Sequence, residues 1–389
     1  MISSDLNLTG TLSRYFTRQY IASFIAIAFM LLTIVYFLEV AELFRRTSGR
    51  EETGLGIVMW MGLAKLPQTA EVVIPFIVLF AAIFTLWRLS TRHEIEIARA
   101  SGLSVWQFTA PLLVVVFLFG VANTTAINPM SSKLLYIYKR LETKFIMGSS
   151  TMELTGAGLW LRQIDGDGVA VVHATKVDDA QTQSPMPGQV VPPALRLKDD
   201  VMVLLFGPNE NYLARIDAAG GELQAGKWVF SNAVIRKPPA ANGASMPPET
   251  LPTYVLPTTL TPSKIEDSLA QPDSLSFWEL PAFIDALERT GFSSTRHRQH
   301  YHALMAEPLL LVAMVLVAIV FMQRQLRQAQ ALPLLVGAVV SGVAVFILNN
   351  TVLAFGISGG IPTFLAAWAV PVAVTALALT MLLHLEEGG

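Results

Sequence analysis

The sequence predicts an α-helical polytopic membrane protein, with six transmembrane helices arranged three and three around an inserted extracytoplasmic all-β domain like a jelly-roll. Three observations predict this fold class. The chain of 389 residues is 53% hydrophobic and only 14% charged, whereas soluble domains are about a quarter charged. Several uncharged runs approach the ~20 residues that cross a bilayer. A polar region near the middle alternates with the two-residue period of strands.

Composition also excludes several functions. The net charge of −2 gives no basic field for a nucleic-acid partner. The chain has no Cys, which removes disulfides, thiolate catalysis and Cys-bound metals. Its six His residues form no His-Glu-x-x-His pattern. We therefore expect no metal and no cofactor. No cleavable signal peptide is evident, so we interpret the first apolar run as a retained helix.

Residues 1–130 are expected to hold the first three transmembrane helices. Three uncharged runs predict them: residues 21–38, 72–87 and 103–127. Arg14 and Arg18 precede the first run. A further apolar stretch, 55–64, lies upstream of the second run, and Lys65 and Pro67 separate the two pieces. The second helix is therefore predicted to be long or kinked.

Residues 131–276 are expected to form the β domain. The letters GLWLRQID and VAVVHATKV alternate between apolar and polar, and the Asp-Gly pairs between them indicate a hairpin. Further strands are predicted at 201–206, 212–217, 228–236 and 254–260. Two Pro-rich stretches are predicted to be loops: residues 178–196 and 238–252.

Residues 277–389 are expected to hold an amphipathic segment at 277–290 and the last three transmembrane helices. The run 303–322 carries one charge, Glu307. The run 332–383 has no formal charge and is too long for one span, so we divide it at Asn349, Asn350 and the letters GISGGIP.

The distribution of Lys and Arg predicts the orientation. With three spans before it, the β domain lies on the side opposite to the N-terminus. One side has the larger set of short-loop basic residues: Arg14, Arg18, Arg88, Arg92, Arg99, Arg324 and Arg327. The other side has a smaller set: Arg45, Arg46, Arg50 and Lys65. Basic residues favour the cytoplasm, which places the N-terminus inside and the β domain outside.

The segment between helices two and three, RLSTRHEIEIARASGLSVWQF, is the most informative motif. It is polar, helix-prone and mixed in charge. One interpretation is a solvated loop anchored by arginines. The other is a coupling helix, at about residues 88–104, that lies in a groove of a partner protein and receives mechanical work from it.

The letters HEIEIARASGLSVWQF resemble the coupling segment of the LptF/LptG lipopolysaccharide-export permease family. Other stretches agree with that family in order: ELFRRTSG, VVIPFIVLFAAIFTLWRLS, LTPSKIEDSLAQPDSLSFWEL and GGIPTFLAAWAVP. The resemblance spans essentially the whole chain and includes its layout of three helices, β domain and three helices. It is closer to the G-type subunit, LptG, than to the F-type.

The resemblance implies a permease subunit of an ABC-type exporter, which extracts lipopolysaccharide from the bacterial inner membrane and passes it to a periplasmic β-jelly-roll bridge. It implies a multi-pass inner-membrane protein with a periplasmic domain and no catalytic residues. The implied partners are a paralogous F-type permease, a cytoplasmic ATPase dimer that hydrolyses ATP, a membrane-anchored jelly-roll subunit, the periplasmic bridge protein and lipopolysaccharide.

The resemblance also assigns roles to residues. Four residues of the coupling segment would serve the ATPase: Arg92, Glu94, Arg99 and Gly102. Six would line the substrate cavity: Phe29, Phe37, Arg45, Arg46, Phe76 and Phe80. Each role has a simpler alternative. The carboxylate at 94 could belong to a helix-surface ion pair, the two arginines could snorkel at the interface, and the phenylalanines could face lipid or pack between helices.

Two positions depart from the family pattern. Glu39 stands where relatives tend to carry Lys, and Leu304 occupies a second basic position. A set of nearby basic residues could compensate: Arg296, Arg298, His300 and His302. We therefore expect a less basic cavity than is usual. Glu307, about a turn into its span, is interpreted as interfacial rather than as a proton relay.

The stretch 221–227, GELQAGK, mimics a phosphate-binding loop but is followed by Trp228 and lies between predicted strands. We expect no nucleotide site there, because such loops need Ser or Thr next and a following helix. Three other functions remain open: the F-type paralogue of the same complex, an ion-driven secondary lipid transporter, and a membrane-anchored scaffold or sensor. The transporter class usually has several charges near mid-bilayer.

Overall fold

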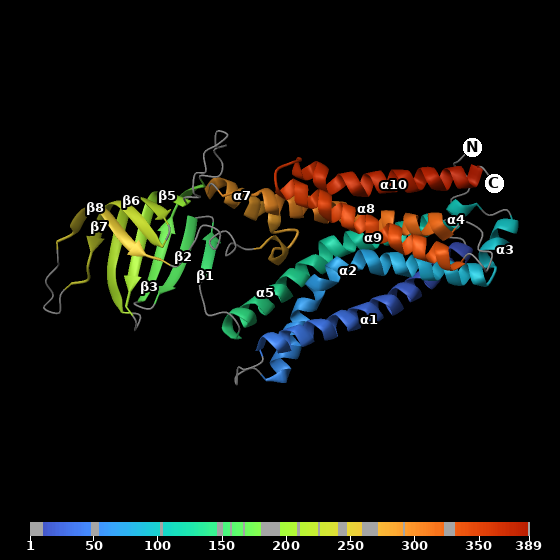
Figure 1. Ribbon diagram of the computed structural model, residues 1–389, viewed down its shortest axis with the longest axis horizontal. Coiled ribbons are helices and arrows are strands. Elements are labelled where there is room, and N and C mark those ends of the chain that lie inside the picture. Colours follow the sequence, from blue (N-terminus) through green and yellow to red (C-terminus); the bar gives the residue numbers. More distant parts are fainter. Residues whose placement is uncertain are drawn as a thin grey trace. The chain divides into compact units, whose positions relative to one another are not determined.

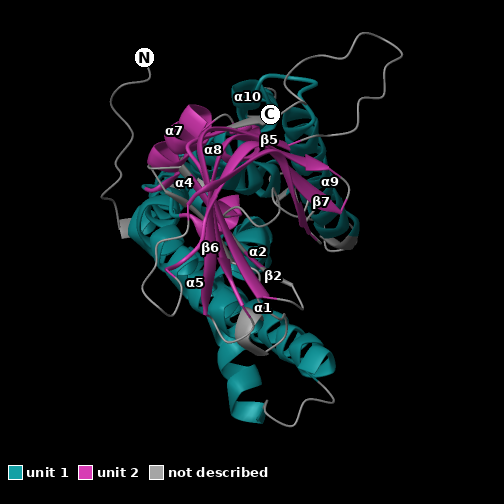
Figure 2. Cartoon of the chain, turned by 90° about the vertical axis from the view of Figure 1, so that its left-hand side faces the viewer, with its two compact units in different colours: residues 1–146, 276–278, 298–389 teal, residues 147–275, 279–297 magenta. Residues whose placement is uncertain are grey.

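The computed structural model describes residues 11–47, 54–101, 104–145, 151–155, 158–165, 168–179, 195–207, 211–224, 226–239, 247–258, 271–290, 292–322 and 331–387. The chain divides into two compact units (Figure 2). Unit 1 comprises residues 1–146, 276–278 and 298–389, and unit 2 comprises residues 147–275 and 279–297. Unit 1 is helical, and unit 2 holds the β-sheet (Figure 1).

The described part of the chain contains six helices that are long and apolar enough to cross a membrane. These spans are formed by α1 (Thr11–Thr47), α2 (Leu55–Thr91), α4 (Val105–Ala122) with the elements that continue it, α8 (Thr295–Met322), α9 (Ala331–Ile357) and α10 (Thr363–Glu387). A short helix, α3 (Glu94–Ala100), lies between α2 and α4. The predicted fold class, a polytopic helical membrane protein with an inserted β domain, is confirmed.

The second and third spans are longer than the apolar runs that predict them. Helix α2 continues through Pro67 and Pro75, so the two apolar pieces form one long helix. The third span runs from α4 through a π-helical segment, η1 (Asn123–Ile127), into α5 (Asn128–Phe145). Residues 131–145, which we expected at the start of the β domain, therefore continue the third helix. They carry charged residues that a search for uncharged runs leaves out.

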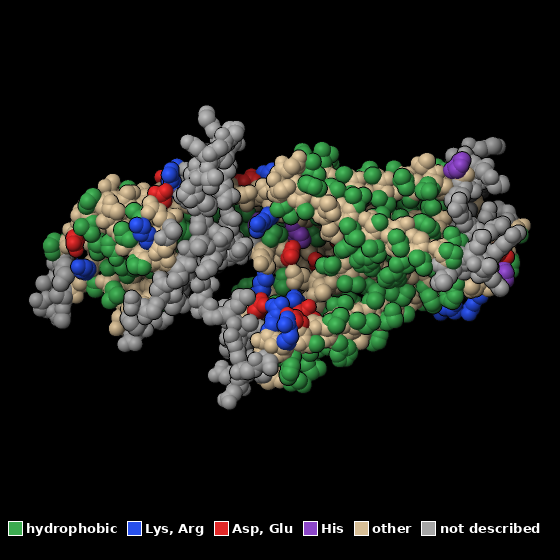
Figure 3. Space-filling model, in the orientation of Figure 1, with side chains coloured by type: hydrophobic (Ala, Val, Ile, Leu, Met, Phe, Trp, Pro, Cys, Tyr) green, Lys and Arg blue, Asp and Glu red, His purple; other side chains and the backbone are tan. Residues whose placement is uncertain are grey.

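Helices α2 and α8 form the centre of unit 1. In the most apolar stretch of each helix, 61% of the residues of α2 and 72% of those of α8 are buried, against 6% of those of α1. Leu79 of α2 and Met314 of α8 belong to one apolar cluster and are fully buried. Helix α1 packs beside α2 and α4, while many of its large apolar side chains face outward, and Figure 3 shows this kind of surface along the helical unit. Such a surface suits lipid or a partner helix rather than water.

Unit 2 contains an antiparallel sheet of eight strands among its described residues. They are β1 (Thr151–Thr155), β2 (Gly158–Asp165), β3 (Gly168–Ala174), β4 (Lys176–Asp179), β5 (Leu195–Phe206), β6 (Tyr212–Gln224), β7 (Lys227–Arg236) and β8 (Glu249–Pro257). The spatial order is β1-β2-β3-β5-β6-β7-β8, and β4 follows β3 along the same side of β5. Of the predicted loops 178–196 and 238–252, residues 180–194 and 240–246 lie outside the described residues. The loop prediction is wrong at their edges, because residues 178–179, 195–196 and 249–252 belong to β4, β5 and β8.

A line of irregular pairing crosses the sheet. Asp199 and Asp200 have positive φ and interrupt the register of β5, and Thr175 separates β3 from β4 at the same level. Asn232, also with positive φ, lies on this line in β7. Bulges bend strands and increase their twist. One face nevertheless stays buried on both sides of the line, as Leu197 and Val201 show.

This creased sheet encloses one apolar core. Trp228, Phe230 and Ile216 are fully buried in it, and helix α7 (Leu280–Thr290) adds Leu287. A short 3-10 turn, η3 (Pro272–Ser274), precedes α7. The domain therefore covers its core with a single sheet whose strands neighbour one another in chain order. The phosphate-loop mimic at 221–227 joins β6 to β7, with φ of 75° at Gly226, so it turns a hairpin.

We expect Gly120→Val to destabilise the helical unit. A Cβ at Gly120 would lie 2.6 Å from Cα of Pro308, so α4 and α8 would have to move apart. Overpacking of this kind costs about 1–3 kcal/mol. The midpoint of thermal unfolding of the full chain in detergent should fall, whereas Val121→Ile, on the exposed side of the same turn, should leave it unchanged. Equal midpoints for the two variants would contradict this close packing.

Candidate functional site

The predicted coupling segment is built from the end of α2, a sharp break and the short helix α3 (Figure 1). The break is His93, whose φ is 58°. Helix α3 begins with Glu94 and Glu96 in its first turn, where carboxylates favour the helix dipole. Helix α4 begins after Ser104, whose hydroxyl accepts from the backbone N–H of Trp106 at 3.1 Å. The segment is therefore a separate short helix with a defined joint on the α2 side.

The two glutamates of α3 have different environments. Tyr15 of α1 donates its hydroxyl to Oε1 of Glu94 at 3.3 Å, and Nη1 of Arg92 lies 4.0 Å from the same oxygen. The Glu94 side chain is only 27% exposed. Glu96 instead pairs with the His93 ring at 2.7 Å, and both of those side chains are exposed. Glu94 is thus held in place from α1, rather than by the i,i+4 pair of our simpler interpretation.

Helix α3 also presents an apolar side chain that we did not predict from the sequence. Ile97 is 67% exposed, whereas Ile95 packs against the apolar core of unit 1. The letters EIEI contain the signal, because two residues that are two apart on a helix point to different sides. Of the other predicted coupling residues, Arg99 lies on α3, and Gly102 lies outside the described residues.

A cluster of charged side chains lies where α1 ends and α2 begins, and Figure 3 shows basic and acidic groups gathered there. Arg45 places Nε and Nη2 2.9 Å from the two oxygens of Glu42. Arg46 donates from Nε to Oε1 of the same carboxylate at 2.8 Å. The two predicted substrate-binding arginines therefore share one internal counter-ion. Because a guanidinium has five N–H donors, both retain donors for a further anion.

Glu39, the departure noted in the sequence, pairs with Nζ of Lys65 on α2 at 2.5 Å. The same ammonium lies 5.5 Å from the ring centre of Tyr138 on α5, and Tyr138 donates to Glu142 at 2.9 Å. These contacts join α1, α2 and α5 above a small apolar cluster that includes Leu43. The acidic residue at position 39 is thus neutralised within the chain.

The four phenylalanines predicted to line a cavity are not brought together in this chain. Phe29 and Phe37 are exposed on α1. Phe76 and Phe80 lie on α2, and Phe76 packs against Phe346 of α9 with ring centres 4.6 Å apart.

The structure also places Leu304, the second departure from the family pattern, and three of the four basic residues that could compensate for it. Leu304 is buried, and Arg296 and Arg298 are exposed. The ring of His302 packs against Phe364 of α10, with centres 5.8 Å apart.

A polar network inside the spans surrounds Glu307. Asn123 is fully buried and donates from Nδ2 to Oε1 of Glu307 at 2.8 Å. The hydroxyl of Thr124 lies 3.0 Å from the backbone oxygen of Leu304 and 3.4 Å from Oε2 of Glu307. Both partners lie on the π-helical segment η1, and such segments occur frequently at functional sites. The carboxylate of Glu307 is therefore bound between two helices, and its interfacial position stays a prediction.

The end of η1 and the start of α5 bind residues 276–278, a short connector that belongs to unit 1. Asn128 donates to Glu71 of α2 at 3.2 Å and accepts from the backbone N–H of Phe277 at 2.8 Å. Trp278 donates from Nε1 to the carbonyl of Thr125 at 3.0 Å. The sequence signal for this site was the polar run NTTAIN at the end of an otherwise apolar stretch.

Among the described residues, no group of three or more His, Cys, Asp or Glu could hold a metal ion.

Comparison with known proteins gives concordant results. A family model described as lipopolysaccharide export system permease LptF/LptG matches residues 14–384. The lipopolysaccharide export system permease protein LptG of Escherichia coli strain K12 is 20% identical over 365 residues, which cover 92% of this chain and 94% of that protein. LptG of Haemophilus influenzae strain Rd is 22% identical over 373 residues, with the same coverage of 92% and 94%.

We expect Glu307→Ala to destabilise the full chain, because it leaves the buried amide of Asn123 without its acceptor. An unsatisfied buried polar group costs about 1–3 kcal/mol. The midpoint of thermal unfolding in detergent should fall for Glu307→Ala and should be largely retained for Glu307→Gln, which keeps an acceptor oxygen. If alanine and glutamine had the same effect, the hydrogen bond to Asn123 would not be what stabilises this helix pair.

Proposed function

Since the chain belongs to the LptF/LptG family of lipopolysaccharide export permeases, we propose that it is the G-type permease subunit of an ABC-type lipopolysaccharide exporter in the bacterial inner membrane. The observation that carries this proposal is the family match over residues 14–384, which includes the separate helix α3 between two spans. The two relatives described above, which are both LptG proteins, support the G type.

The orientation follows from the basic residues. With the N-terminus of α1 and helix α3 in the cytoplasm, Arg14, Arg18, Arg88 and Arg92 all lie on the inner side. The charged cluster of Glu42, Arg45 and Arg46 then lies at the outer end of α1, and unit 2 is periplasmic. The β domain is bounded by α5 and the connector at 276–278.

Work would enter through α3. A cytoplasmic ATPase dimer hydrolyses ATP, and a groove on that partner receives Glu94 and the exposed Ile97, with Arg92, Arg99 and Gly102 completing the contact. An apolar side chain beside a carboxylate on a short helix is a suitable anchor, because buried apolar contacts supply affinity and charge supplies register. Helix α3 lies directly between α2 and α4 in the chain, so its displacement moves both spans.

Substrate would meet the outward face of α1. A paralogous F-type permease pairs with this chain, and the exposed Phe29 and Phe37 contact acyl chains in the shared cavity, with Phe76 and Phe80 on α2 behind them. Arg45 and Arg46 bind phosphates of the glycolipid with charge-assisted hydrogen bonds. Unit 2 then passes lipopolysaccharide on to a membrane-anchored jelly-roll subunit and a periplasmic bridge protein.

A second candidate function is an ion-driven secondary lipid transporter. The observation that favours it is Glu307, a carboxylate bound by Asn123 and Thr124 within the spans. Lipid transport by the purified chain in vesicles without an ATPase would support this function and exclude the exporter subunit. If the chain is instead the F-type paralogue of the same complex, it should co-purify with a G-type chain. A scaffold would bind protein without glycolipid.

Glu94→Ala should cut ATP turnover coupled to export at least tenfold while membrane insertion stays intact, because the carboxylate contacts a basic group of the ATPase; such charge pairs are worth roughly 1.5 kcal/mol or more. ATPase activity and glycolipid release are measured on the reconstituted complex. Glu96→Ala, on the same helix but paired with His93, and Tyr15→Phe, which keeps the carboxylate, are the controls. A Glu94→Ala complex that assembles and exports normally would exclude this contact.

The pair Arg45→Gln and Arg46→Gln should reduce photocrosslinking of lipopolysaccharide from a probe at the outer end of α1 by about thirtyfold, since two lost charge-assisted bonds of roughly 1 kcal/mol each add to ~2 kcal/mol. Glu42→Gln removes the shared counter-ion and should increase crosslinking. Lys133→Gln with Arg140→Gln removes two exposed charges from α5 and serves as the control. Unchanged crosslinking in all variants would mean that the arginines only anchor the helix end.

A further inference from the structure

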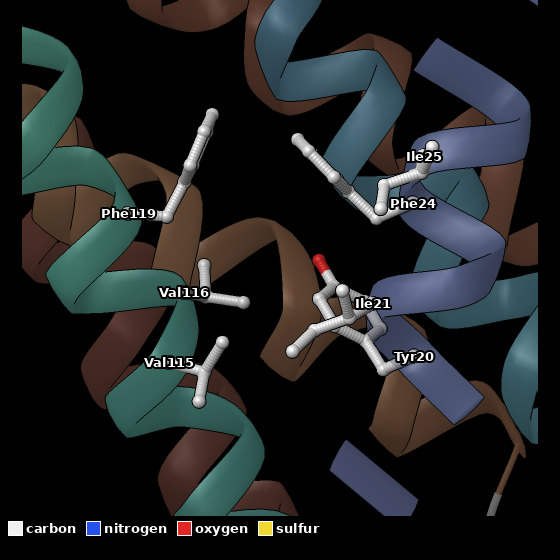
Figure 4. A pocket seen from close by; sticks show the side chains of 7 residues that line it. All are labelled: Tyr20, Ile21, Phe24, Ile25, Val115, Val116 and Phe119. Atoms are coloured by element: carbon white, nitrogen blue, oxygen red, sulfur yellow. The ribbon is translucent and has the colours of Figure 1, made fainter. Parts of the chain in front are cut away.

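A cavity of about 280 Å³ lies between α1 and α4, outside the cluster proposed to bind lipopolysaccharide (Figure 4). Ile21, Phe24 and Ile25 of α1 line one side, and Val116 and Phe119 of α4 line the other. Its accessible lining has no polar surface, because the hydroxyl of the buried Tyr20 is directed at the carbonyl of Val78, 3.5 Å away. The cavity therefore suits a hydrocarbon chain.

A second cavity, of about 450 Å³, continues the first one toward the N-terminus of α1. The two cavities share Ile21 and Val115, so together they form one groove. At its far end lie Arg14 and Arg18, both exposed and one helical turn apart on the same face. Among the described residues, no carboxylate forms an ion pair with either guanidinium.

The groove has the dimensions of half a bilayer. From Arg14 to Ile25 helix α1 rises about 16 Å at 1.5 Å per residue. The hydrocarbon of one leaflet is about 15 Å thick, half of the ~30 Å core. Two cations thus lie at one interface, and an apolar channel follows them to about the bilayer centre.

We propose that this groove binds an anionic phospholipid, with its phosphate on Arg14 and Arg18 and one acyl chain along Ile21, Val115 and Phe119. Charge complementarity selects this occupant over a neutral lipid or an uncharged transmembrane helix, because neither would use two guanidinium groups that have no ion-pair partner among the described residues. The site lies in the cytoplasmic leaflet if the orientation proposed above holds. The lipid chemistry itself does not depend on that orientation.

Such a lipid would lie beside the coupling contact. Tyr15, the residue between the groove and α3, donates to Glu94, and Arg14 and Arg18 flank it on α1. A bound lipid would therefore hold the N-terminal end of α1 in place next to the helix that receives the ATPase.

The test is native mass spectrometry of the full chain in detergent, titrated with phosphatidylglycerol or with phosphatidylcholine of the same acyl composition. Wild-type protein should retain the anionic lipid preferentially. Arg14→Gln with Arg18→Gln should weaken its retention roughly tenfold or more, since each basic residue near an anionic headgroup contributes on the order of a fivefold factor. Val115→Trp, which fills the groove without changing charge, should also displace the lipid.

Two controls match these variants. Lys133→Gln with Arg140→Gln removes the same charge from α5, and Leu118→Trp places the same ring on an exposed position of α4; both should retain the lipid. Equal binding of the two lipids would show annular lipid only and would overturn the proposal. The proposal would also be overturned if the groove variants kept the lipid but no longer bound a partner subunit. The groove would then be a docking site for a helix of that partner. The readout uses neither ATP nor lipopolysaccharide, so it can fail while the exporter function holds.

Discussion

Hydrocarbon offers no hydrogen bonds, so every polar group within a membrane-spanning helix must find its partner in the protein. In unit 1, a few contacts between helices that are far apart in sequence supply such partners. Asn123 with Glu307 joins the third span to the fourth, and Glu39 with Lys65 joins the first to the second. Since most residues of the buried faces are apolar, and lipid is as apolar as they are, these polar contacts and close van der Waals packing help to decide which helices are neighbours.

The fold was predictable to the extent that one physical period or one composition dominated a segment. Apolar runs with at most one charge identified each span, and alternation identified β2 and β3, while the further predicted strands covered part of each of β5 to β8. Prediction failed where the composition changed within one element or where the backbone conformation was unusual for the residue type. Helix α5 crosses from apolar to charged composition without ending, and the hydropathy of residues 131–145 therefore resembled a loop. The crease at Asp199 and Asn232 depends on positive φ at residues other than glycine, which composition does not reveal.

The candidate site divides in the same way. That Glu94 belongs to a short helix between two spans could be read from the sequence, but its hydrogen bond to Tyr15 could not, because the two residues are separated by nearly the whole length of two spans. Similarly, the doubled arginines at 45 and 46 were visible, whereas their common attachment to Glu42 requires side-chain geometry. Ile97 was hidden by its neighbour Ile95, since only the phase of the helix distinguishes the buried residue from the exposed one.

The chain-order pairing of unit 2 has a consequence for biosynthesis. Strands β3 and β4 both pair with β5, and every other neighbouring pair in the sheet joins strands that are consecutive in the chain. Sheets of such local pairings have low contact order and fold quickly for their class. The sheet from β1 to β8 can therefore assemble while the ribosome is still synthesising the last three helices, and those helices insert after the domain has formed its strand pairs.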